Sequence, residues 1–411
     1  MDVFCGIDWA EDHHDIALAG RDGGLLARLR IGDDAAGLAR LLELLAENGD
    51  SPDDPVPVAI ETPRGLLVAC LRATGRKVYP VNPMAVARYR DRHSVAGRKS
   101  DHGDAVVLAN ILRTDLHAHR PLPADSELAQ AIAVLARAQQ DAVWDRITAH
   151  NKLRSHLREY YPGFLAAFAA KAGGIMRPEA RVILAAAPAP AGAARLTLAQ
   201  LRALLKKAGR SRGIDAEAQR LRDALRTGQM RQLPLVEQAM GRQALALLRQ
   251  LDAACHSADD LEQAATESFN LHPDAGIITS FPGIGPLTGA RVLAETGDDR
   301  SRFRDAKGLK AYAGAAPITR ASGKTRSITR RHVKNNRLAQ AGYIWAFSAL
   351  TASPGSRTHY DRRREAGDRH AAAERNLFGR LLSCLHHCLA TGQHYNEATA
   401  FPSQTTTPAA A

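Results

Sequence analysis

Four acidic side chains near the start of the chain have the types and spacing of a metal site. Asp8 and Glu61 each end a short apolar segment typical of a buried strand, and Asp101 and Asp104 lie three residues apart in a segment with helical periodicity. Residues three apart on a helix share a face. Carboxylates buried together repel one another unless a cation compensates their charge. The set therefore predicts a Mg²⁺ site suited to phosphoryl transfer, with all four acids as ligands.

Each of these acids taken alone has a simpler interpretation. An acid at a strand end is commonly a turn or cap residue, and Asp101 could N-cap its own helix. Only the ordered combination favours the metal site. The segment 98–100 (Arg-Lys-Ser), directly before Asp101, adds a candidate phosphate contact. The segment 13–15 (His-His-Asp) follows the first strand, where solvated turn residues are expected; the alternative is that one of the three approaches the metal site.

Positive charge is concentrated in one part of the sequence. The 411 residues carry a formal net charge of +12, which suggests an anionic partner such as nucleic acid. Between Ser301 and Arg337 there are 11 basic residues and a single acidic one, so this window holds +10 of the total. The rest of the chain is nearly neutral. A phosphate backbone is therefore expected to bind at this basic block.

Ser322 lies inside the basic block and is followed by a glycine, so its hydroxyl is expected to be accessible. A serine that attacks a phosphodiester would form a covalent phosphoserine link to DNA. The more common role of a serine in a basic loop is to contact a phosphate, and Thr325, Ser327 and Thr329 are equally placed for either role. The cations expected to hold the phosphate are Arg320, Lys324, Arg326, Arg330 and Arg331.

The segment 280–288 (SFPGIGPLT) precedes the basic block and predicts a helix-hairpin-helix. Gly283 and Gly285 flank one apolar residue in a tight turn, and Pro286 suits the first position of a helix that runs to Gly297. Backbone N–H groups at such a turn can bind a phosphate without contacting base edges. The alternative is a plain packing corner between two helices.

These candidate residues require particular elements to position them. The first 122 residues predict an α/β domain, with strands over 3–8, 15–19, 25–31, 56–60 and 78–81 and helices after Asp33–Asp34, over 65–73 and from Asp101 onward. Residues 123–272 predict a helical connector. A long helix begins near residue 126, a linker covers 185–195, an insertion of unknown role lies near 170–235, and an amphipathic helix over 234–268 pairs with the first helix as an antiparallel coiled coil. Residues 273–398 predict a mostly helical domain, and 399–411 a disordered tail.

In this order, the features resemble the DEDD-type insertion-sequence transposases, a family that includes Piv-type invertases and bridge-RNA-guided recombinases. The resemblance covers most of the chain except the segment 170–235 and the tail. It is carried by Gly6-Ile7-Asp8-Trp9-Ala10, Ile60-Glu61-Thr62-Pro63-Arg64-Gly65, Val81-Asn82-Pro83, Lys99-Ser100-Asp101-His102-Gly103-Asp104-Ala105, Pro282-Gly283-Ile284-Gly285, Phe303, Tyr312-Ala313-Gly314, Pro317 and Ser322-Gly323.

The resemblance implies an RNase H-like (RuvC-type) N-terminal domain, a coiled-coil connector and a C-terminal transposase domain. It implies that Asp8, Glu61, Asp101 and Asp104 bind Mg²⁺ and that Ser322 is the nucleophile. It further implies donor and target DNA as substrates, a structured guide (bridge) RNA, and a homo-oligomer, dimer or tetramer, that joins the two sites between subunits.

Two other functions remain open on the sequence alone. A structure-specific nuclease or junction resolvase would use only the four acids, and an architectural DNA-binding protein would use only the hairpin and the basic block. Cys384, His387 and Cys388 are expected to pack on a helix rather than bind zinc. The absence of a long apolar run argues against a membrane partner, and five cysteines and no visible secretion signal suggest a bacterial cytoplasmic, nucleoid-associated protein.

Overall fold

The computed structural model describes residues 2–93, 101–323 and 325–402, with the side chains of 93, 101 and 102 left out. The segment 98–100, Lys324 and the tail beyond 402 lie outside the described residues. The chain forms two units, Met1–Ala124 and Asp125–Ala411, and each is described by itself. None of the helices within the described ranges is long and apolar enough to cross a membrane.

The first unit contains a five-stranded mixed sheet with the order β3-β2-β1-β4-β5. β1 pairs antiparallel with β2, which pairs antiparallel with β3, whereas β4 and β5 run parallel to β1. Gly23, with a φ of 91°, forms the turn between β2 and β3. The strands predicted from the apolar segments are all present: β1 (Val3–Trp9), β2 (His13–Gly20), β3 (Leu25–Gly32), β4 (Val58–Ile60) and β5 (Val78–Pro80).

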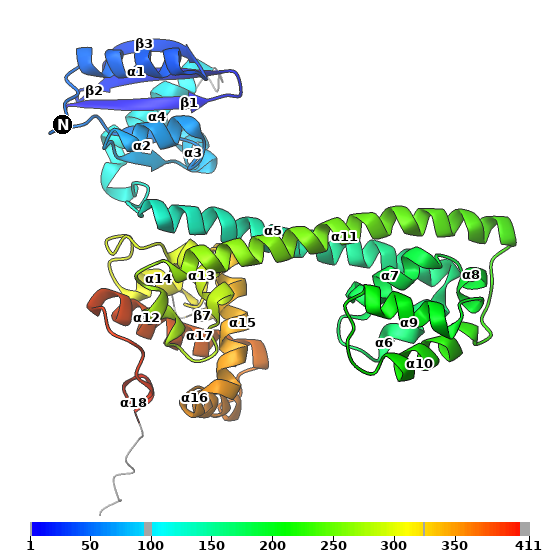
Figure 1. Cartoon of the computed structure of the whole chain (residues 1–411). Helices are drawn as coiled ribbons and strands as arrows, with labels where there is room; N and C mark the ends of the chain where they lie inside the picture. The colour runs from blue at the N-terminus through cyan, green and yellow to red at the C-terminus, as the bar shows by residue number, and fades with distance from the viewer. Residues whose placement is uncertain (1, 94–100, 324, 403–411) are drawn as a thin grey trace, which may run out of the picture. The chain divides into compact units, whose positions relative to one another are not determined.

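Helices cover both faces of this sheet (Figure 1). On one face, Cys5 and Ile7 of β1 pack in a core with leucines of α1 and α2, and on the other Phe4 packs with Leu108 of α4. Asp34 caps α1 by accepting a hydrogen bond from the Gly37 amide, as predicted. The helices of this unit are α1 (Ala35–Glu47), α2 (Leu66–Ala73), α3 (Pro83–His93) and α4 (Asp101–Asp115), followed by the short 3-10 helix η1 (Leu116–Ala118).

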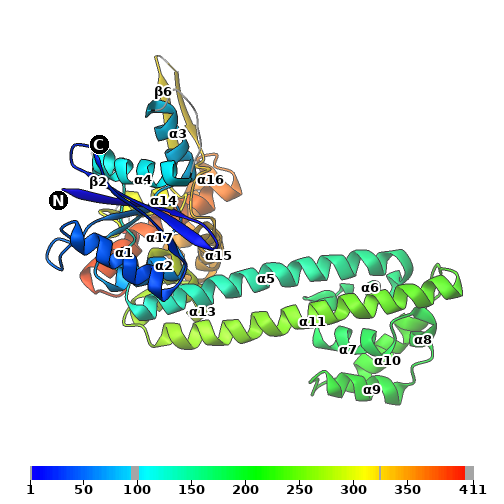
Figure 2. The ribbon, with the colours of Figure 1, turned by 90° about the horizontal axis from the view of Figure 1, so that it is seen from above.

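The second unit contains two long helices, α5 (Glu127–Tyr160) and α11 (Pro234–Asn270). They lie side by side and run in opposite directions, as the predicted coiled coil requires (Figure 2). Ser126 caps α5, and Pro162 begins the next helix directly after it ends. The buried residues of α11 include the small residues Gly241 and Ala244.

The linker predicted over residues 185–195 is wrong. Most of this segment is helical, and Ala187 and Ala193 are buried in a core with Tyr160 of α5. The Tyr160 hydroxyl donates a hydrogen bond of 2.6 Å to the Pro188 carbonyl oxygen. Small alanines allow close packing, which a reading of composition alone mistakes for a flexible linker. The helices here are α6 (Pro162–Ala169), η2 (Gly174–Met176), α7 (Pro178–Ala186), α8 (Pro190–Ala194), α9 (Leu198–Lys207) and α10 (Ile214–Arg226).

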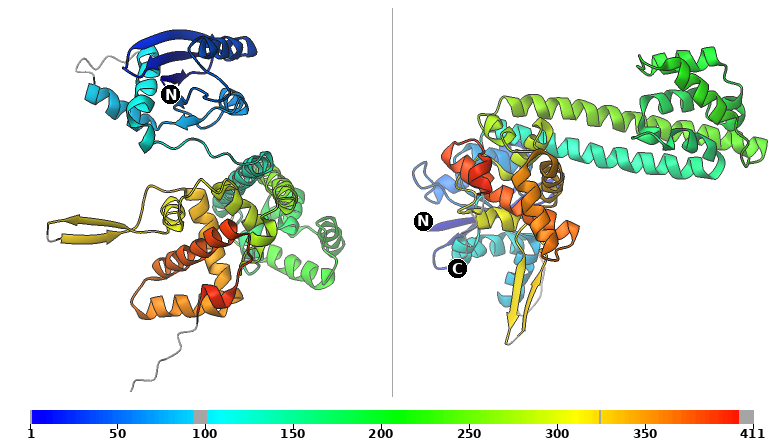
Figure 3. Two further views of the ribbon diagram at one scale, coloured as in Figure 1. Left: turned by 90° about the vertical axis from the view of Figure 1, so that its left-hand side faces the viewer. Right: turned by 90° about the horizontal axis from the view of Figure 1, so that it is seen from below.

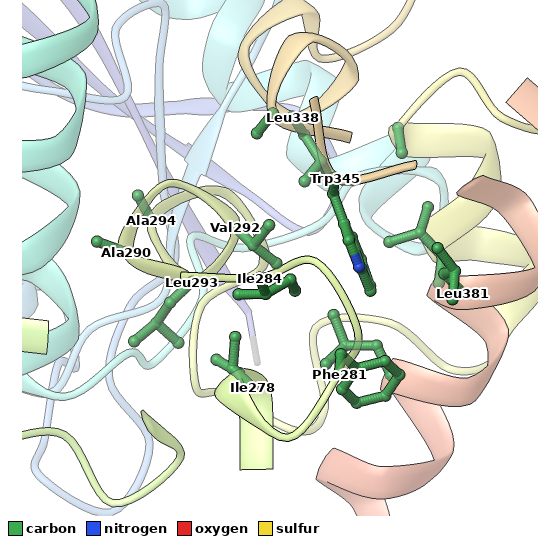
Figure 4. Close-up of a cluster of buried hydrophobic side chains, with 14 of the residues drawn as sticks. Ile278, Phe281, Ile284, Ala290, Val292, Leu293, Ala294, Leu338, Trp345 and Leu381 are labelled. Carbon is green, nitrogen blue, oxygen red and sulfur yellow. The ribbon is translucent and has the colours of Figure 1, made fainter. Parts of the chain in front are cut away.

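The rest of the second unit is a helical body built around Trp345 (Figure 4). The Trp345 ring contacts Phe281 edge to face, and its Nε1 donates to the Pro282 carbonyl oxygen over 3.1 Å. The disordered tail predicted from residue 399 is wrong for its first residues, because α18 continues to Ala400 and Ala400 is buried. The helices are α12 (Ala275–Thr279), α13 (Pro286–Thr296), α14 (Ala306–Tyr312), α15 (Asn336–Ala352), α16 (Pro354–Glu365), α17 (His370–Thr391) and α18 (Glu397–Ala400).

A two-stranded hairpin, β6 (Ile318–Ser322) and β7 (Thr325–Thr329), extends from this helical body (Figure 3). The sequence predicted a basic loop here and missed the strands. The β-branched residues Ile318, Thr319, Ile328 and Thr329 favour extended backbone, but no apolar face accompanies them because nearly every residue of the hairpin is exposed. Without a buried face there is no hydrophobic alternation for sequence reasoning to detect.

Candidate active site

Asp8 and Glu61 stand at the same edge of the sheet. The parallel register pairs Ile7 of β1 with Ile60 of β4, so the next residue of each chain segment is one of the two acids. Both side chains line a cavity of about 470 Å³. Carboxyl ends of neighbouring parallel strands form a common edge, and this explains why two acids 53 positions apart in the sequence meet.

Helix α4 brings Asp104 into the same cavity. Phe4, Gly6 and Asp8 alternate along β1 toward the face that α4 covers, and Phe4 shares a core with Leu108 of α4. A side chain at Gly6 would overlap the Ala105 carbonyl oxygen of α4. Glycine at this position therefore lets the helix approach closely enough for Asp104 to line the cavity with Asp8 and Glu61.

Asp104 is buried and forms an ion pair with Arg90 of α3. Among the residues that the structure describes, no three His, Cys, Asp or Glu side chains converge closely enough to hold a metal ion. Three hard oxygen donors around one cavity nevertheless suit Mg²⁺ chemically, and Arg90 supplies the positive charge that a cation would otherwise provide. Asp101, the fourth predicted ligand, begins α4, and its side chain is not described.

Sequence reasoning missed several residues of this cavity. Arg90 and Trp9 line it together with the three acids, and so does His13, from the segment in which one residue was considered as an approach to the metal site. The solvated turn predicted for 13–15 is wrong, because these residues begin β2. His14 is fully buried and its Nε2 lies 3.2 Å from Asp33 Oδ1, an ion-pair distance. The signal in the sequence was the short segment between the first two strands, because a β-hairpin needs few connecting residues and the second strand can therefore begin early.

The segment 280–288, for which a helix-hairpin-helix was predicted, joins α12 to α13 through a tight turn, an arrangement that a plain packing corner between two helices also has. Gly283 has a φ of 79°, and a Cβ there would lie 2.6 Å from the Ala349 backbone nitrogen. Both constraints require glycine. Gly285 is the N-cap residue of α13 and is exposed, and Pro286 occupies the first turn. The turn therefore presents the start of α13 to solvent.

Ser322 is the last residue of β6, next to the turn of the hairpin. It pairs with Thr325, and the turn residue Gly323 has a φ of 54°. The Ser322 side chain is exposed. Because side chains alternate along a strand, Arg320 shares the face of Ser322. Arg326 pairs with Ala321 and lies on the opposite face, so the two arginines are not equivalent.

Residues 5–162 match a family model described as Transposase, of the DEDD type found in IS110 elements, and residues 275–361 match the Transposase IS116/IS110/IS902 family. A putative transposase of the IS117 mini-circle from Streptomyces coelicolor is 65% identical, over 98% of this chain and 97% of that protein. The chain belongs to the IS110 family of DEDD transposases. It is an insertion-sequence transposase, and DNA is its substrate.

Other relatives of this transposase are more distant. An uncharacterized 42 kDa protein of the element IS900 from Mycobacterium paratuberculosis is 29% identical, over 97% of the chain and 98% of its own length. An uncharacterized 44.8 kDa protein of IS116 from Streptomyces clavuligerus is 30% identical, over 93% of each chain. The IS117 relative aligns over 401 residues, so most of the segment 170–235 has a counterpart there.

Proposed function

We propose that this transposase cuts and rejoins DNA with a Mg²⁺-dependent acidic site in the first unit and a covalent serine–DNA intermediate in the second. The observation that carries the proposal is that Asp8, Glu61 and Asp104, from three different elements, line one cavity. The strand order, with three antiparallel strands followed by two parallel ones, supports an RNase H-like fold. Asp101 is proposed as the fourth ligand because it lies one helical turn before Asp104 on α4.

The acids Asp8, Glu61, Asp101 and Asp104 would hold Mg²⁺, which when bound supplies electrostatic stabilisation of the charge that develops on the phosphate. The chain itself supplies the nucleophile. The Ser322 hydroxyl loses its proton as its oxygen bonds to phosphorus, one backbone P–O bond breaks, and the released sugar oxygen takes up a proton, so the step has no net proton change. Attack by a new sugar hydroxyl reverses these steps and restores Ser322. The number of phosphodiester bonds is conserved, so no energy source is needed for strand exchange.

Exposed cations and backbone groups position the DNA strand. Arg320 shares the face of Ser322 and is proposed to hold the phosphate under attack. Arg326 on β7, and Arg330 and Arg331 directly after it, extend the positive charge toward the base of the hairpin. Lys324 lies outside the described residues and is proposed as a further phosphate contact from the sequence alone. The start of α13, with its exposed N-cap residue Gly285 and the partly buried Gly283 of the preceding turn, is proposed to contact a second backbone phosphate. These contacts read no base edges, which supports a structured guide (bridge) RNA as the source of sequence specificity.

Ser322→Ala tests the covalent step. With DNA that carries the ends of the element, we expect the protein–DNA adduct seen on a denaturing gel to disappear in this variant. Thr325→Ala, which changes the residue paired with Ser322, is the matched control and should keep the adduct. An adduct that persists in Ser322→Ala would remove Ser322 from the mechanism.

The reaction products separate this proposal from a Mg²⁺-dependent nuclease or junction resolvase that uses only the acids. Rejoined strands are expected for a recombinase. Hydrolysed nicks without any rejoined product, at the same rate in Ser322→Ala, would favour the nuclease. DNA binding without cleavage of any substrate in Mg²⁺ would leave only an architectural role.

A further inference from the structure

A second concentration of positive charge lies in the helices between the two long ones. Residues 162–233, which we call the helical insert, contain 13 basic residues and four acidic ones. This net charge of +9 nearly equals the +10 of residues 301–337, and an acidic excess in the remaining residues conceals it in the total of +12. The insert is therefore a second candidate for binding an anionic partner.

The insert lies at the end of α5 and α11 (Figures 1 and 2). Its core contains Phe164 and adjoining residues of the two long helices, among them Tyr160. Gln140, 20 residues earlier on α5, donates a hydrogen bond to Gln340 of the helical body that carries the Ser322 hairpin. At 1.5 Å per residue, Gln140 and Tyr160 are roughly 30 Å apart. The insert is therefore a separate part of the second unit.

The four acids of the insert neutralise only some of its cations. Glu217 is buried, and hydrogen bonds from Arg220 and Lys171 lower its pKa to about 2. The other acids are also engaged, Glu179 by Arg177 and Arg210, Asp215 by Arg202, and Asp223 by Gln219. Arg181 and Arg231 form ion pairs with acids of α11. The carboxylates of the insert are thus already bound by its own side chains.

Six cations of the insert form no ion pair in the part of the chain that the structure describes. Five of them are exposed and one is partly buried, and all six lie on α9 and α10 or directly beside them. They are Arg195, Lys206, Lys207, Arg212, Arg222 and Arg226. α9 and α10 pack against each other and against α6, α7 and α8, so they form the outer layer of the insert (Figure 1).

These cations lie at both ends of α9 and α10. At one end, Arg226 Nε donates a hydrogen bond of 3.1 Å to the Ala194 carbonyl oxygen, which places Arg226 beside Arg195. At the other end, Lys206 and Lys207 complete α9, and the next helix begins two residues after Arg212. The ten residues of α9 span about 15 Å. Duplex DNA carries one charge per roughly 1.7 Å, so this length faces about nine phosphates.

The loop between α9 and α10 leaves its main chain accessible. Gly209 and Gly213 have φ of 82° and 59°, a region that favours glycine. A Cβ at Gly209 would meet no other described residue within 4 Å, and Ser211 between the two glycines is exposed. A phosphate backbone can therefore come close to the main chain between the cations.

The insert offers charge without a surface on which bases could stack. Its only aromatic residues are Phe164 and Phe168, and both are buried in the core. Single strands and RNA loops are commonly bound by stacking their bases on exposed aromatic side chains. A DNA duplex keeps its bases stacked on one another and presents twice the charge per unit length of a single strand. The surface therefore fits a duplex.

We propose that α9 and α10 of the helical insert bind the phosphate backbone of duplex DNA, away from the bonds that are cut. DNA is the occupant because it is the substrate of this transposase. Contacts to phosphates hold the duplex without reading its sequence. The inference requires neither the acidic site nor Ser322, so it goes beyond the proposed function.

Hydrogen–deuterium exchange of the full-length protein, in a buffer without Mg²⁺, shows where DNA binds. A duplex of about 30 base pairs is roughly 100 Å long, whereas α11 spans roughly 55 Å, so the probe can reach along the whole second unit. We expect this duplex to slow amide exchange in residues 206–213, and a single strand of the same length to slow it much less. Unchanged exchange in this loop with the duplex bound would contradict the proposal.

Arg195→Gln combined with Arg212→Gln removes one exposed cation from each end of α9 and α10. The affinity for the same duplex is measured by fluorescence anisotropy between about 50 and 200 mM salt. Each phosphate contact contributes about 0.9 to the slope of log affinity against log salt. We therefore expect the slope of the double variant to be less steep by about two. Circular dichroism checks that the variant is folded.

Arg28→Gln combined with Arg40→Gln is the matched control. Both arginines are exposed on the first unit, on β3 and α1, and neither forms an ion pair with a described residue. The control loses the same charge as the double variant of the insert. Its salt slope should stay at the value of the unmodified protein.

An unchanged slope in the insert variant, or an equal change in the control, would overturn the proposal. Stronger slowing of exchange in residues 206–213 by duplex RNA than by duplex DNA would overturn the assignment to DNA. An insert variant with an altered oligomeric state and an unchanged slope would assign the surface to contacts between copies of the chain instead. Loss of strand exchange in Ser322→Ala affects neither measurement, so the two proposals fail separately.

Discussion

The acidic cavity of the first unit and the Ser322 hairpin of the second are built in opposite ways. Strand register places Asp8 and Glu61, and the buried Asp104 is placed by the close approach of α4 and an ion pair with Arg90. Ser322 is exposed at the end of two strands whose described residues are almost all exposed. A site that holds a metal needs fixed ligands, whereas a hairpin that delivers a nucleophile to DNA needs access. The comparison indicates that the first unit provides a rigid acidic site and the second provides an accessible serine.

The largest expected effect comes from separating the two sites genetically. Asp8→Asn and Ser322→Ala are each expected to abolish strand exchange. If the sites of different subunits combine in a homo-oligomer, a mixed oligomer of the two variants keeps one intact pair, and mixing should restore part of the activity. Strand exchange measured before and after subunit exchange checks this. No recovery in verified mixed oligomers would show that both sites of one subunit act together.

Gly6→Ala should disturb the acidic cavity of the first unit. The added methyl group overlaps the Ala105 carbonyl oxygen, so α4 must move away from β1 and carry Asp104 with it. Overpacking of this kind lowers the free energy of unfolding by about 1–3 kcal/mol. Denaturant unfolding of the full chain, followed together with strand exchange, measures both consequences.

Gly20→Ala is the control for this change, because the nearest atom to its added methyl group is the Asp22 carboxylate, at the end of a side chain that can move. Gly20→Ala is expected to be nearly neutral. Equal losses in the two variants would mean that the approach of α4 at Gly6 is unimportant.

Arg320→Gln and Arg326→Gln test the Ser322 hairpin of the second unit. Arg320 lies on the Ser322 face of the hairpin and Arg326 on the opposite face, although both are exposed arginines of the same two strands. We expect Arg320→Gln to slow adduct formation about tenfold, the range of one charge-assisted hydrogen bond, and Arg326→Gln to change it much less. Similar losses in both would indicate that the hairpin acts only through its overall charge.

Arg90→Gln is expected to give the smallest effect. Arg90 provides the positive charge beside Asp104, so its removal should lower the Mg²⁺ concentration needed for half-maximal strand exchange by a few-fold. A titration with Mg²⁺ measures this directly. A requirement that stays the same or rises would show that the ion pair does not oppose cation binding.

Much of the local structure follows from the sequence. Apolar strand segments ending in Asp8 and Glu61, the Asp34 cap of α1, and the periodicity of α5 and α11 are all local patterns, and the structure contains the corresponding elements. The linker over 185–195 was the main error, since alanine and proline form both flexible segments and tightly packed short helices. Composition does not distinguish these outcomes, because burial against Tyr160 depends on a distant part of the chain.

The sequence by itself determined which residues have suitable chemistry: four acids, a serine and a block of positive charge. Only the tertiary structure decided which of them meet. Strand pairing brings Asp8 and Glu61 together, Arg90 joins them from α3, and the hairpin register separates Arg320 from Arg326. Side-chain types and spacing are local properties, whereas register, close approach and burial arise from contacts between residues far apart in the chain.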